Sequence, residues 1–495
     1  MRSCQILLFP NLSCSLNWYE SDLVVFNLAV VCQWIPEFGI LNMKHLLTFA
    51  FFSFFCWFFT PASIQAAEVM KPNVVLIFID DMGYGDIEPF GSTKVRTPNL
   101  NTFAREGRKF HSFYATPVCS MSRAALMTGC YNQRISIPGV LFPQAKIGIN
   151  SSENTVAEVL KSAGYATACI GKWHLGHLPE FLPTRHGFDH YFGLPYSNDM
   201  NAKRPGNPPL PLIRGEKTIE TEPDQSLLTK RYTEDAIEFM KQNKSNPFFL
   251  YLPHTMIHGP MAASEAFKGK SASGLLGDVI EEIDWSVGQV MKTIKELGLD
   301  EKTLVIFTSD NGPATGSAGP FRGKKGSNFE GGVREPCIMR WPGKIPAGTQ
   351  CKQIAGNIDV LPTLASLAGV KLDPKQVIDG RDISSLMMDD KAGPVRDVHL
   401  YCTANLANPV QAIRMGDWKL FLPSPNEGGN EKKKKDKGNT PEANMLFNLD
   451  KDPGETTNVY DKNPEIVEKL RKEARIRINE ILANRRPAGG AVGSK

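Results

Sequence analysis

The sequence predicts an α/β fold in which helices flank a large mixed, mostly parallel sheet, followed by a smaller C-terminal antiparallel sheet with a helix. Three predominantly apolar runs, at residues 73–79, 247–253 and 303–309, are typical of strands buried on both faces of a parallel sheet. Segments with helical spacing of apolar residues lie between them. From about Val398 the apolar runs become short, which indicates that the second sheet begins there.

The length of 495 residues is enough for two or more domains with a sizeable core. We expect a main domain at residues 67–390, a small antiparallel domain at 391–486 and a disordered tail at 487–495. The lysine-rich segment at 432–437 is expected to be a solvated loop. A formal net charge of +4 is mild for this length, so nothing indicates binding to nucleic acid.

The N-terminal part of the chain predicts export. A short positive start opens at Met43, an apolar run follows at 46–59, and small residues near Ala66 suit cleavage. We therefore expect Met43 to be the true start of the protein, so that residues 1–42 are an upstream over-read and residues 43–66 a signal peptide. The mature protein is expected to be secreted or periplasmic. The apolar run is shorter than the roughly 20 residues that a membrane span needs, so no stable span is expected.

Polar residues directly follow two of the predicted strands. Asp80 and Asp81 come after the first strand, and Asp310 and Asn311 come after the strand at 303–309. The carboxyl ends of such strands are where open α/β sheets place their ligands. An isolated pair of aspartates is more often a solvated turn or a helix cap. The four hard oxygen donors together suit Ca²⁺ or Mg²⁺ rather than zinc.

One cysteine precedes a predicted helix. Cys119 stands before an alanine- and leucine-rich run, and Ser120 and Ser122 are available to cap the helix. Arg123 lies one turn further along the same helix face. Helix N-termini and guanidinium groups both bind anions, so the pattern favours chemistry on sulfate or phosphate esters. The alternative interpretation is that Cys119 is a small buried hydrophobe.

A lysine and a histidine follow the short strand at 165–170. Lys172 and His174 are two residues apart, so in extended backbone they project to one side. There they could hold an anionic ester and protonate its leaving oxygen. Such a pair is more often a pair of surface side chains without a catalytic role. Two further histidines, His254 and His258, follow the strand at 247–253.

These segments resemble the motifs of formylglycine-dependent type I sulfatases, in the arylsulfatase A-like branch of the alkaline phosphatase superfamily. The segment from Cys119 to Arg123 resembles the signature Cys-x-Pro/Ser/Ala-x-Arg and departs from it at Met121. Residues 171–176 and 323–336 resemble two further motifs. Because the resemblance covers nearly all of residues 71–480, it implies an alkaline phosphatase-like fold and makes the expected main domain the catalytic sulfatase domain.

The resemblance also implies cofactors and site residues. The cofactors are Ca²⁺, with Mg²⁺ as the alternative, and a formylglycine made from Cys119 by a formylglycine-generating enzyme. The implied metal ligands are Asp80, Asp81, the oxidised Cys119, Asp310 and Asn311. The implied catalytic residues are Cys119, Arg123, Lys172, His174, His258 and Lys325, with Lys324 as a near-equal alternative to Lys325. Ser197 is expected to touch the substrate, and His254 to be structural.

The family mechanism implies that one oxygen of the hydrated formylglycine attacks sulfur, while His258 or a lysine assists loss of the alcohol. A base, here His174, then deprotonates the second hydroxyl so that sulfate leaves. We expect the substrate to be a sulfated polysaccharide, a glycosaminoglycan or an aryl sulfate. The alternatives are a phosphodiesterase or phosphonate hydrolase of the same superfamily, and a non-catalytic glycan-binding relative if Cys119 is not converted. The loops at about 195–225 and 395–440 carry no readable substrate code.

Overall fold

The computed structural model describes residues 4–7, 13–16, 71–423 and 442–492. The chain divides into two compact units, Met1–Glu68 and Val69–Lys495. In the first unit, β1 (Cys4–Leu7) and β2 (Ser13–Leu16) pair antiparallel. The predicted signal peptide and the lysine-rich loop lie outside the described residues.

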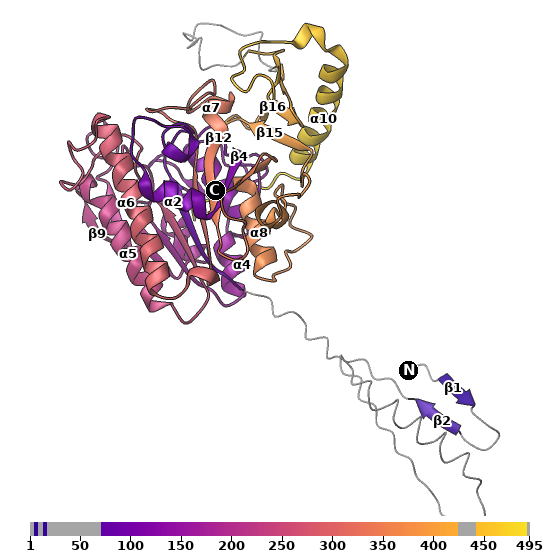
Figure 1. The fold of residues 1–495 in the computed structure, drawn as a ribbon, viewed down its shortest axis with the longest axis horizontal. Helices are drawn as coiled ribbons and strands as arrows, with labels where there is room; N and C mark the ends of the chain where they lie inside the picture. The colour runs from indigo at the N-terminus through magenta and orange to yellow at the C-terminus, as the bar shows by residue number, and fades with distance from the viewer. Residues whose placement is uncertain (1–3, 8–12, 17–70, 424–441, 493–495) are drawn as a thin grey trace, which may run out of the picture. The chain divides into compact units, whose positions relative to one another are not determined.

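The second unit contains an 11-stranded sheet (Figure 1). Its strands are β3 (Asn73–Ile79), β4 (Arg108–Tyr114), β6 (Ala166–Ile170), β7 (His190–Gly193), β8 (Pro211–Arg214), β9 (Lys217–Thr221), β10 (Phe248–Pro253), β11 (Thr303–Ser309), β12 (Arg334–Arg340), β13 (Thr349–Cys351) and β14 (Ala355–Gly356). The order is β13-β4-β12-β11-β3-β10-β6-β7-β8-β9, and β14 also pairs with β4. The central pairs are parallel, whereas β12, β8 and β9 run antiparallel to their neighbours. The predicted mixed, mostly parallel sheet is confirmed.

Helices cover both faces of this sheet because its central strands are apolar on both faces. In β3, Val75 and Ile77 pack into one hydrophobic cluster, whereas Val74 and Leu76 pack into the other. The first cluster includes residues of α2 (Pro98–Glu106), α5 (Leu228–Gln242) and α6 (Gly274–Glu296). The second includes residues of α3 (Cys119–Thr128), α4 (Val156–Ser162), α8 (Val360–Leu367) and α9 (Ser384–Met388).

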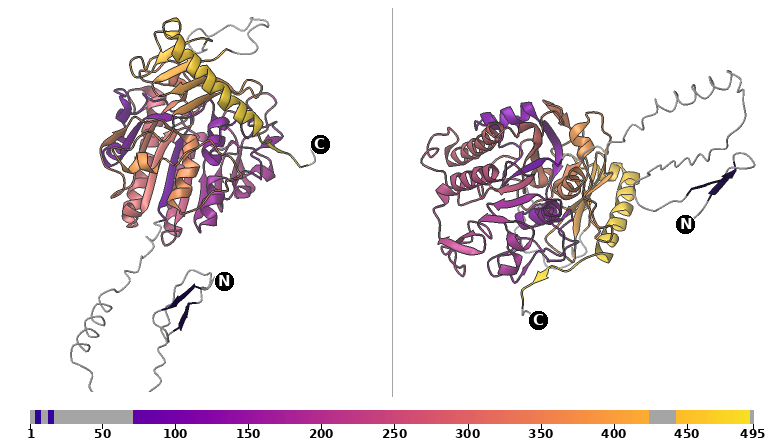
Figure 2. Two further views of the ribbon diagram at one scale, coloured as in Figure 1. Left: turned by 90° about the vertical axis from the view of Figure 1, so that its right-hand side faces the viewer. Right: turned by 90° about the horizontal axis from the view of Figure 1, so that it is seen from below.

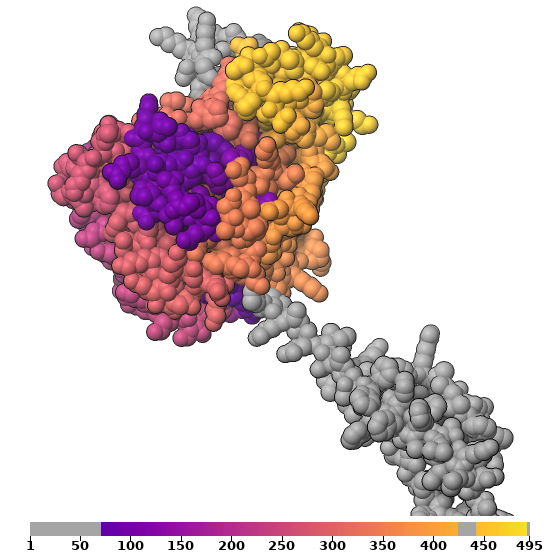
Figure 3. Space-filling model, viewed as in Figure 1, coloured from indigo at the N-terminus to yellow at the C-terminus, as the bar shows by residue number. Residues whose placement is uncertain are grey.

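A second, antiparallel sheet follows near the C-terminus of the unit. It contains β15 (Val398–Cys402), β16 (Val410–Met415), β17 (Trp418–Phe421) and β18 (Leu446–Asn448) in that order. Helix α10 (Pro464–Ala483) lies across it (Figure 2). In the space-filling view the last part of this segment, from residue 442 on and in yellow, packs directly on the orange part of the same unit (Figure 3). The predicted small sheet with its helix is confirmed.

Helix α3 lies between the two sheets. Ala124, Leu126 and Met127 belong to the core of the large sheet, whereas Met121 and Ala125 pack with residues of β15–β17 and α10. All ten residues of α3 are therefore buried. Met121, at which the chain departs from the signature, fills the hydrophobic core on the side of the small sheet.

Two sequence predictions are wrong. Neither Ser120 nor Ser122 caps α3, because its N-cap residue is Val118, without a side-chain cap, and both serines lie inside the first turn. The expectation of a disordered tail from residue 487 also fails for the described residues. There β19 (Gly489–Gly490) pairs antiparallel with β5 (Ile147–Gly148), since glycine allows close packing against Phe181.

Candidate active site

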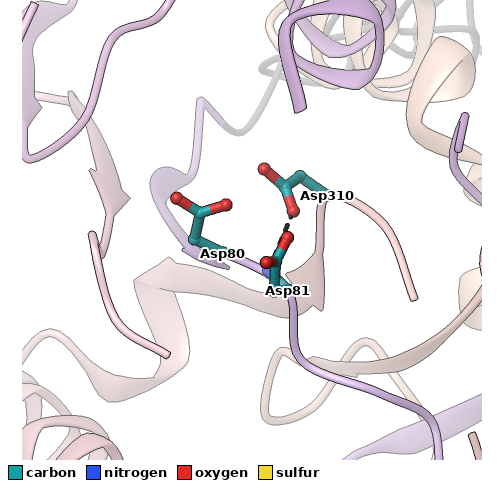
Figure 4. Close-up of side chains that lie close together, drawn as sticks. All are labelled: Asp80, Asp81 and Asp310. Carbon is teal, nitrogen blue, oxygen red and sulfur yellow. Dashed lines mark hydrogen bonds between the residues drawn. The ribbon is translucent and has the colours of Figure 1, made fainter. Parts of the chain in front are cut away.

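The acids predicted at two strand ends meet at one point. Strands β3 and β11 pair in parallel with Ile79 opposite Ser309, so Asp80 and Asp310 emerge side by side. One carboxylate oxygen each from Asp80, Asp81 and Asp310 lies within 4.8 Å of the others (Figure 4). The backbone N–H of Asp81 donates to Oδ1 of Asp310 at 3.1 Å, and Asp81 adopts a left-handed φ of 65°. Strain of this kind concentrates at functional sites.

The donor set fits a divalent cation. Among the described residues, Oδ1 of Asp80 and Oδ1 of Asn311 are buried without a hydrogen-bond partner. Nδ2 of Asn311 donates to Asp81 at 2.7 Å, which turns its oxygen away from that bond. Burial and the neighbouring charge of Asp80 raise the pKa of Asp310 to about 7. A bound cation would reduce the repulsion between the carboxylates and would coordinate the two oxygens that lack a hydrogen-bond partner. Ca²⁺ and Mg²⁺ prefer such oxygen ligands.

Arg123 is directed into the cluster from the first turns of α3. Its Nε and Nη2 donate to Oδ2 of Asp310 at 3.2 and 2.8 Å, and its Nη1 donates to the carbonyl of Lys172 at 2.7 Å. The side chain is fully buried. Burial alone would lower the pKa of Arg123, but Asp310 and Asp80 raise it above its usual value, so the group stays charged.

Cys119 is the first residue of α3 and is 2% exposed. Burial raises the pKa of its thiol, and Lys172 and Lys325 oppose that rise. Its sulfur is not part of the carboxylate cluster. The predicted ligand is an oxygen of oxidised residue 119, so this placement of the thiol does not test that prediction. All six cysteines within residues 71–423 are free.

His174 has one ring nitrogen with a fixed role. Its Nε2 lies 3.0 Å from the carbonyl oxygen of Leu141, which can only accept, so Nε2 carries the proton. Nδ1 therefore has a free lone pair, and no described residue bonds to it. Burial and the charge of Lys172 hold the pKa of His174 well below its usual value. The backbone is not extended as expected, because His174 has a φ of 60°, yet Lys172 and His174 both remain buried here.

Lys172, Ser197 and His258 form a chain of contacts. Nζ of Lys172 donates to Oδ2 of Asp80 at 2.5 Å and to Oγ of Ser197 at 3.2 Å. That Oγ lies 3.4 Å from Nδ1 of His258. The ion pair with Lys172 also keeps the carboxylate of Asp80 charged. Burial alone would raise the pKa of Asp80, but Lys172 and His258 hold it below its usual value.

His258 points Nε2 toward the cluster, 3.9 Å from Oδ2 of Asp81. Its Nδ1 faces two oxygen acceptors, the carbonyl of Gly259 at 2.6 Å and Oδ1 of Asn198 at 3.1 Å, so Nδ1 carries a proton. His254 instead contacts Oγ of Ser286 on α6, which agrees with the expected structural role.

Lys325 reaches the cluster and Lys324 is exposed. Nζ of Lys325 lies 2.6 Å from Oδ1 of Asp81. The side chains of Lys325 and His258 are 19% and 15% exposed, whereas Asp80, Asp81, Asp310, Arg123 and Lys172 are at most 2% exposed. The cluster therefore faces solvent on the side of His258 and Lys325.

Two groups at the site were not predicted. Asn198 orients His258, and the signal for it was its position directly after Ser197 in the sequence. The carbonyl of Leu141 sets the tautomer of His174, but a backbone oxygen leaves no mark in a sequence.

Comparison with known proteins identifies the family to which the chain belongs. Residues 72–370 match the Sulfatase family, residues 323–426 match N-sulphoglucosamine sulphohydrolase, C-terminal, and residues 394–485 match the C-terminal region of aryl-sulfatase. N-acetylgalactosamine-6-sulfatase of Mus musculus is 36% identical over 436 residues, covering 79% of this chain and 82% of its own. Arylsulfatase A of Bos taurus is 38% identical over 435 residues, covering 81% and 85%. The crystal structure of PsFucS1 sulfatase from Pseudoalteromonas sp. aligns with a TM-score of 0.73 at 27% identity, covering 84% and 91%.

The fold and the site define a hydrolase with the alkaline phosphatase-like fold. The named relatives are sulfuric ester hydrolases. The chain belongs to the sulfatase family and hydrolyses sulfate esters. In the described part of the chain, no helix has the length and apolar character needed to span a membrane.

Proposed function

We propose that this sulfatase removes sulfate from a sulfated carbohydrate, using a formylglycine formed from Cys119 and a bound Ca²⁺ or Mg²⁺ ion. The observation that carries the proposal is the cluster of three carboxylates beside the guanidinium of Arg123. The residues proposed to hold the cation are Asp80, Asp81, Asp310 and Asn311, with an oxygen of the oxidised residue 119 as a further ligand.

The two cofactors supply separate chemistry. A bound divalent cation would supply Lewis-acid neutralisation of the negative charge on the sulfate group. The hydrate of formylglycine would supply a nucleophilic oxygen at the start of α3. The protein contributes orientation and charge: Arg123 is locked by its paired bonds to Asp310, and the uncapped N-terminus of α3 presents N–H groups to an anion.

His174 is proposed as the base that takes a proton from a hydroxyl of residue 119. Leu141 links His174 to Ser120, the residue after Cys119, because its N–H donates to Oγ of Ser120 at 3.1 Å while its carbonyl accepts from Nε2 of His174. The free lone pair on Nδ1 and the lowered pKa keep this nitrogen able to accept a proton.

The exposed side of the cluster is proposed to bind the sulfate and its leaving oxygen. Lys172, Lys325 and Ser197 provide donors to the sulfate oxygens. Because Nδ1 of His258 already carries a proton, Nε2 can protonate the departing alcohol only from the doubly protonated ring, which the nearby carboxylates of Asp80 and Asp81 favour. One such contact to a transition state is commonly worth about 3–4 kcal/mol, so loss of Lys172 or Lys325 should lower kcat by about 10²–10³-fold.

A carbohydrate substrate is supported by the relatives. One is named for a 6-sulfated N-acetylgalactosamine, and a solved relative of 28% identity comes from the metabolism of multiple glycosaminoglycans. Aryl sulfates form the second substrate class, because arylsulfatase A is equally similar in sequence. We further propose export through a signal peptide at residues 43–66 and conversion of Cys119 by a formylglycine-generating enzyme.

The test is to express the full chain with and without a formylglycine-generating enzyme. Mass spectrometry of the peptide that carries residue 119 should show the aldehyde in place of the thiol. Sulfate release should then be measured on a panel of sulfated sugars, 4-nitrophenyl sulfate and 4-nitrophenyl phosphate. The control is Cys119→Ala, which keeps a small residue at the helix start but cannot be oxidised to the aldehyde.

Release of sulfate only by the converted protein, in a calcium- or magnesium-dependent manner, is the expected result. Equal activity of the Cys119→Ala variant would overturn the formylglycine proposal. Preferential hydrolysis of the phosphate would favour a phosphohydrolase instead. Binding of sulfated glycans without release of sulfate from converted protein would indicate a glycan-binding relative.

A further inference from the structure

An exposed aromatic residue directly follows Leu141, whose carbonyl bonds to the proposed base His174. Among the described residues, Phe142 carries the one exposed aromatic ring, with 46% of its surface accessible. The residue before it, Leu141, is bonded through its N–H to Ser120 and through its carbonyl to His174. Phe142 therefore directly follows the residue whose backbone contacts both Ser120 and His174.

The backbone that carries this ring is held in place. The N–H of Ala145 donates to the carbonyl of Phe142 at 2.8 Å, which closes a tight turn with Pro143 at its second position. Leu141 and Pro143 on either side are buried. The ring thus projects from a fixed turn, so it can bind a partner with little loss of conformational freedom.

A second loop adjoins this turn and carries positive charge. Nε2 of Gln144 donates to the carbonyl of Gly206 at 2.8 Å and to Oδ1 of Asn207 at 3.1 Å. The same loop exposes Lys203 and Arg204, and Arg204 is paired with Asp199 at 2.9 Å.

This second loop leads directly back to the active site. It begins at Ser197 and Asn198, whose side chains lie 3.4 and 3.1 Å from Nδ1 of His258. The two loops therefore form one continuous rim beside the cluster, which we call the 142/203 rim and define as residues 141–145 and 198–207.

We propose that the 142/203 rim is a subsite for the sugar ring next to the sulfated one, and that this second ring carries its own anionic group. The proposal rests on the proposed carbohydrate sulfatase function. An aromatic face packs on the apolar C–H face of a sugar, and Lys203 offers a cation to a sulfate or carboxylate on the same ring. A simple aryl sulfate has no second ring, so it would leave this rim unused.

The kinetic test compares mono- and disaccharide substrates. The probes are monosulfated monosaccharides and the sulfated disaccharides and tetrasaccharides of chondroitin sulfate, heparan sulfate and carrageenan. In wild type, kcat/KM should be higher for the best disaccharide than for its monosaccharide. Phe142→Ala should reduce this ratio about five- to tenfold, mainly through KM, because an aromatic contact is worth about that factor.

Matched variants separate stacking from general apolar contact and from charge. Phe142→Tyr keeps the ring and should keep the ratio, whereas Phe142→Leu keeps apolar surface without a ring and should behave as Phe142→Ala. Lys203→Gln should reduce the ratio and weaken its dependence on salt. Ile219→Ala, at an exposed apolar residue on β9, is the control expected to leave all kinetics unchanged.

A binding measurement separates this proposal from the proposed function. Calorimetric titration of the Cys119→Ala protein with the same oligosaccharides needs no turnover. Affinity for a disaccharide that falls about five- to tenfold in Cys119→Ala/Phe142→Ala supports the subsite even if no sulfate is released by converted protein. If sulfate release is normal and neither the ratio nor the affinity depends on Phe142, the subsite is refuted while the sulfatase function stands.

Discussion

Replacing Lys419 with methionine should lower the free energy of unfolding by about 3–5 kcal/mol. Lys419 lies on β17 and is fully buried. Its Nζ donates to the carbonyl of Asn328 at 2.7 Å and lies 2.9 Å from Glu330 and 2.8 Å from Glu455. Methionine keeps much of the volume but removes the charge, so two buried carboxylates lose their shared partner.

The protonation state of Glu455 determines where the loss of unfolding free energy lies within the range of about 3–5 kcal/mol. Burial raises the pKa of Glu455 to about 7 while Lys419 lowers it, so without Lys419 the carboxyl is neutral at pH 7. Glu330 keeps Arg334 at 3.2 Å and the hydroxyls of Tyr114 and Tyr401. We therefore expect Lys419→Met to lower the free energy of unfolding by about 3 kcal/mol. The double variant Lys419→Met/Glu455→Gln should have a free energy of unfolding within about 1 kcal/mol of that of the single variant.

The assay is urea unfolding at pH 7, followed by circular dichroism and analysed by linear extrapolation. Lys451→Met, at an exposed lysine, is the matched control and should change stability by less than about 0.5 kcal/mol. The segment that Lys419 holds also carries Lys325, so kcat should fall under conditions where the variant is folded. A loss below about 1 kcal/mol for Lys419→Met would refute the reasoning.

Three further predictions follow from single groups. Chelation of divalent metal and Asp310→Asn should each reduce sulfate release by at least about a hundredfold, and added Ca²⁺ should restore only the chelated wild type. Burial lowers the pKa of His186 from 6.5 to about 4, so the unfolded state takes up a proton first as pH falls below 6.5. Stability should then fall by about 1.4 kcal/mol per pH unit through this one residue, and urea unfolding of His186→Phe at pH 7 and pH 5 should show that slope removed. Asn198→Ala removes an acceptor from Nδ1 of His258 and should lower kcat about tenfold or more and shift its pH profile, measured with 4-nitrophenyl sulfate.

The sequence predicts which acids meet where they directly follow strands with a clear apolar pattern. Asp80 and Asp310 each follow a long apolar strand, and parallel pairing of those strands necessarily brings them together. The same reasoning could not choose between Lys324 and Lys325, because adjacent residues differ only in the direction that the loop gives them. The structure directs Lys325 to Asp81.

Errors arose where distant contacts decide local structure. The composition around Gly489 predicts a flexible tail, yet its missing side chain lets this residue pack beside Ile149 and Phe181. Ser120 has the composition of a cap, but its hydroxyl accepts from Leu141 instead. His174 departs from the alternation of an extended strand because its φ is positive, which no residue pattern in this segment indicates.

The burial of α3 between two sheets has a consequence for maturation. If Cys119 is converted as proposed, the oxidising enzyme has to bind the chain around Cys119, and the folded protein buries that whole helix under strands that lie almost 300 residues later in the sequence. The proposed conversion would therefore have to precede closure of the small sheet over α3. Under this proposal, molecules that fold before oxidation would keep their thiol, so the yield of converted enzyme would be set by the relative rates of oxidation and folding.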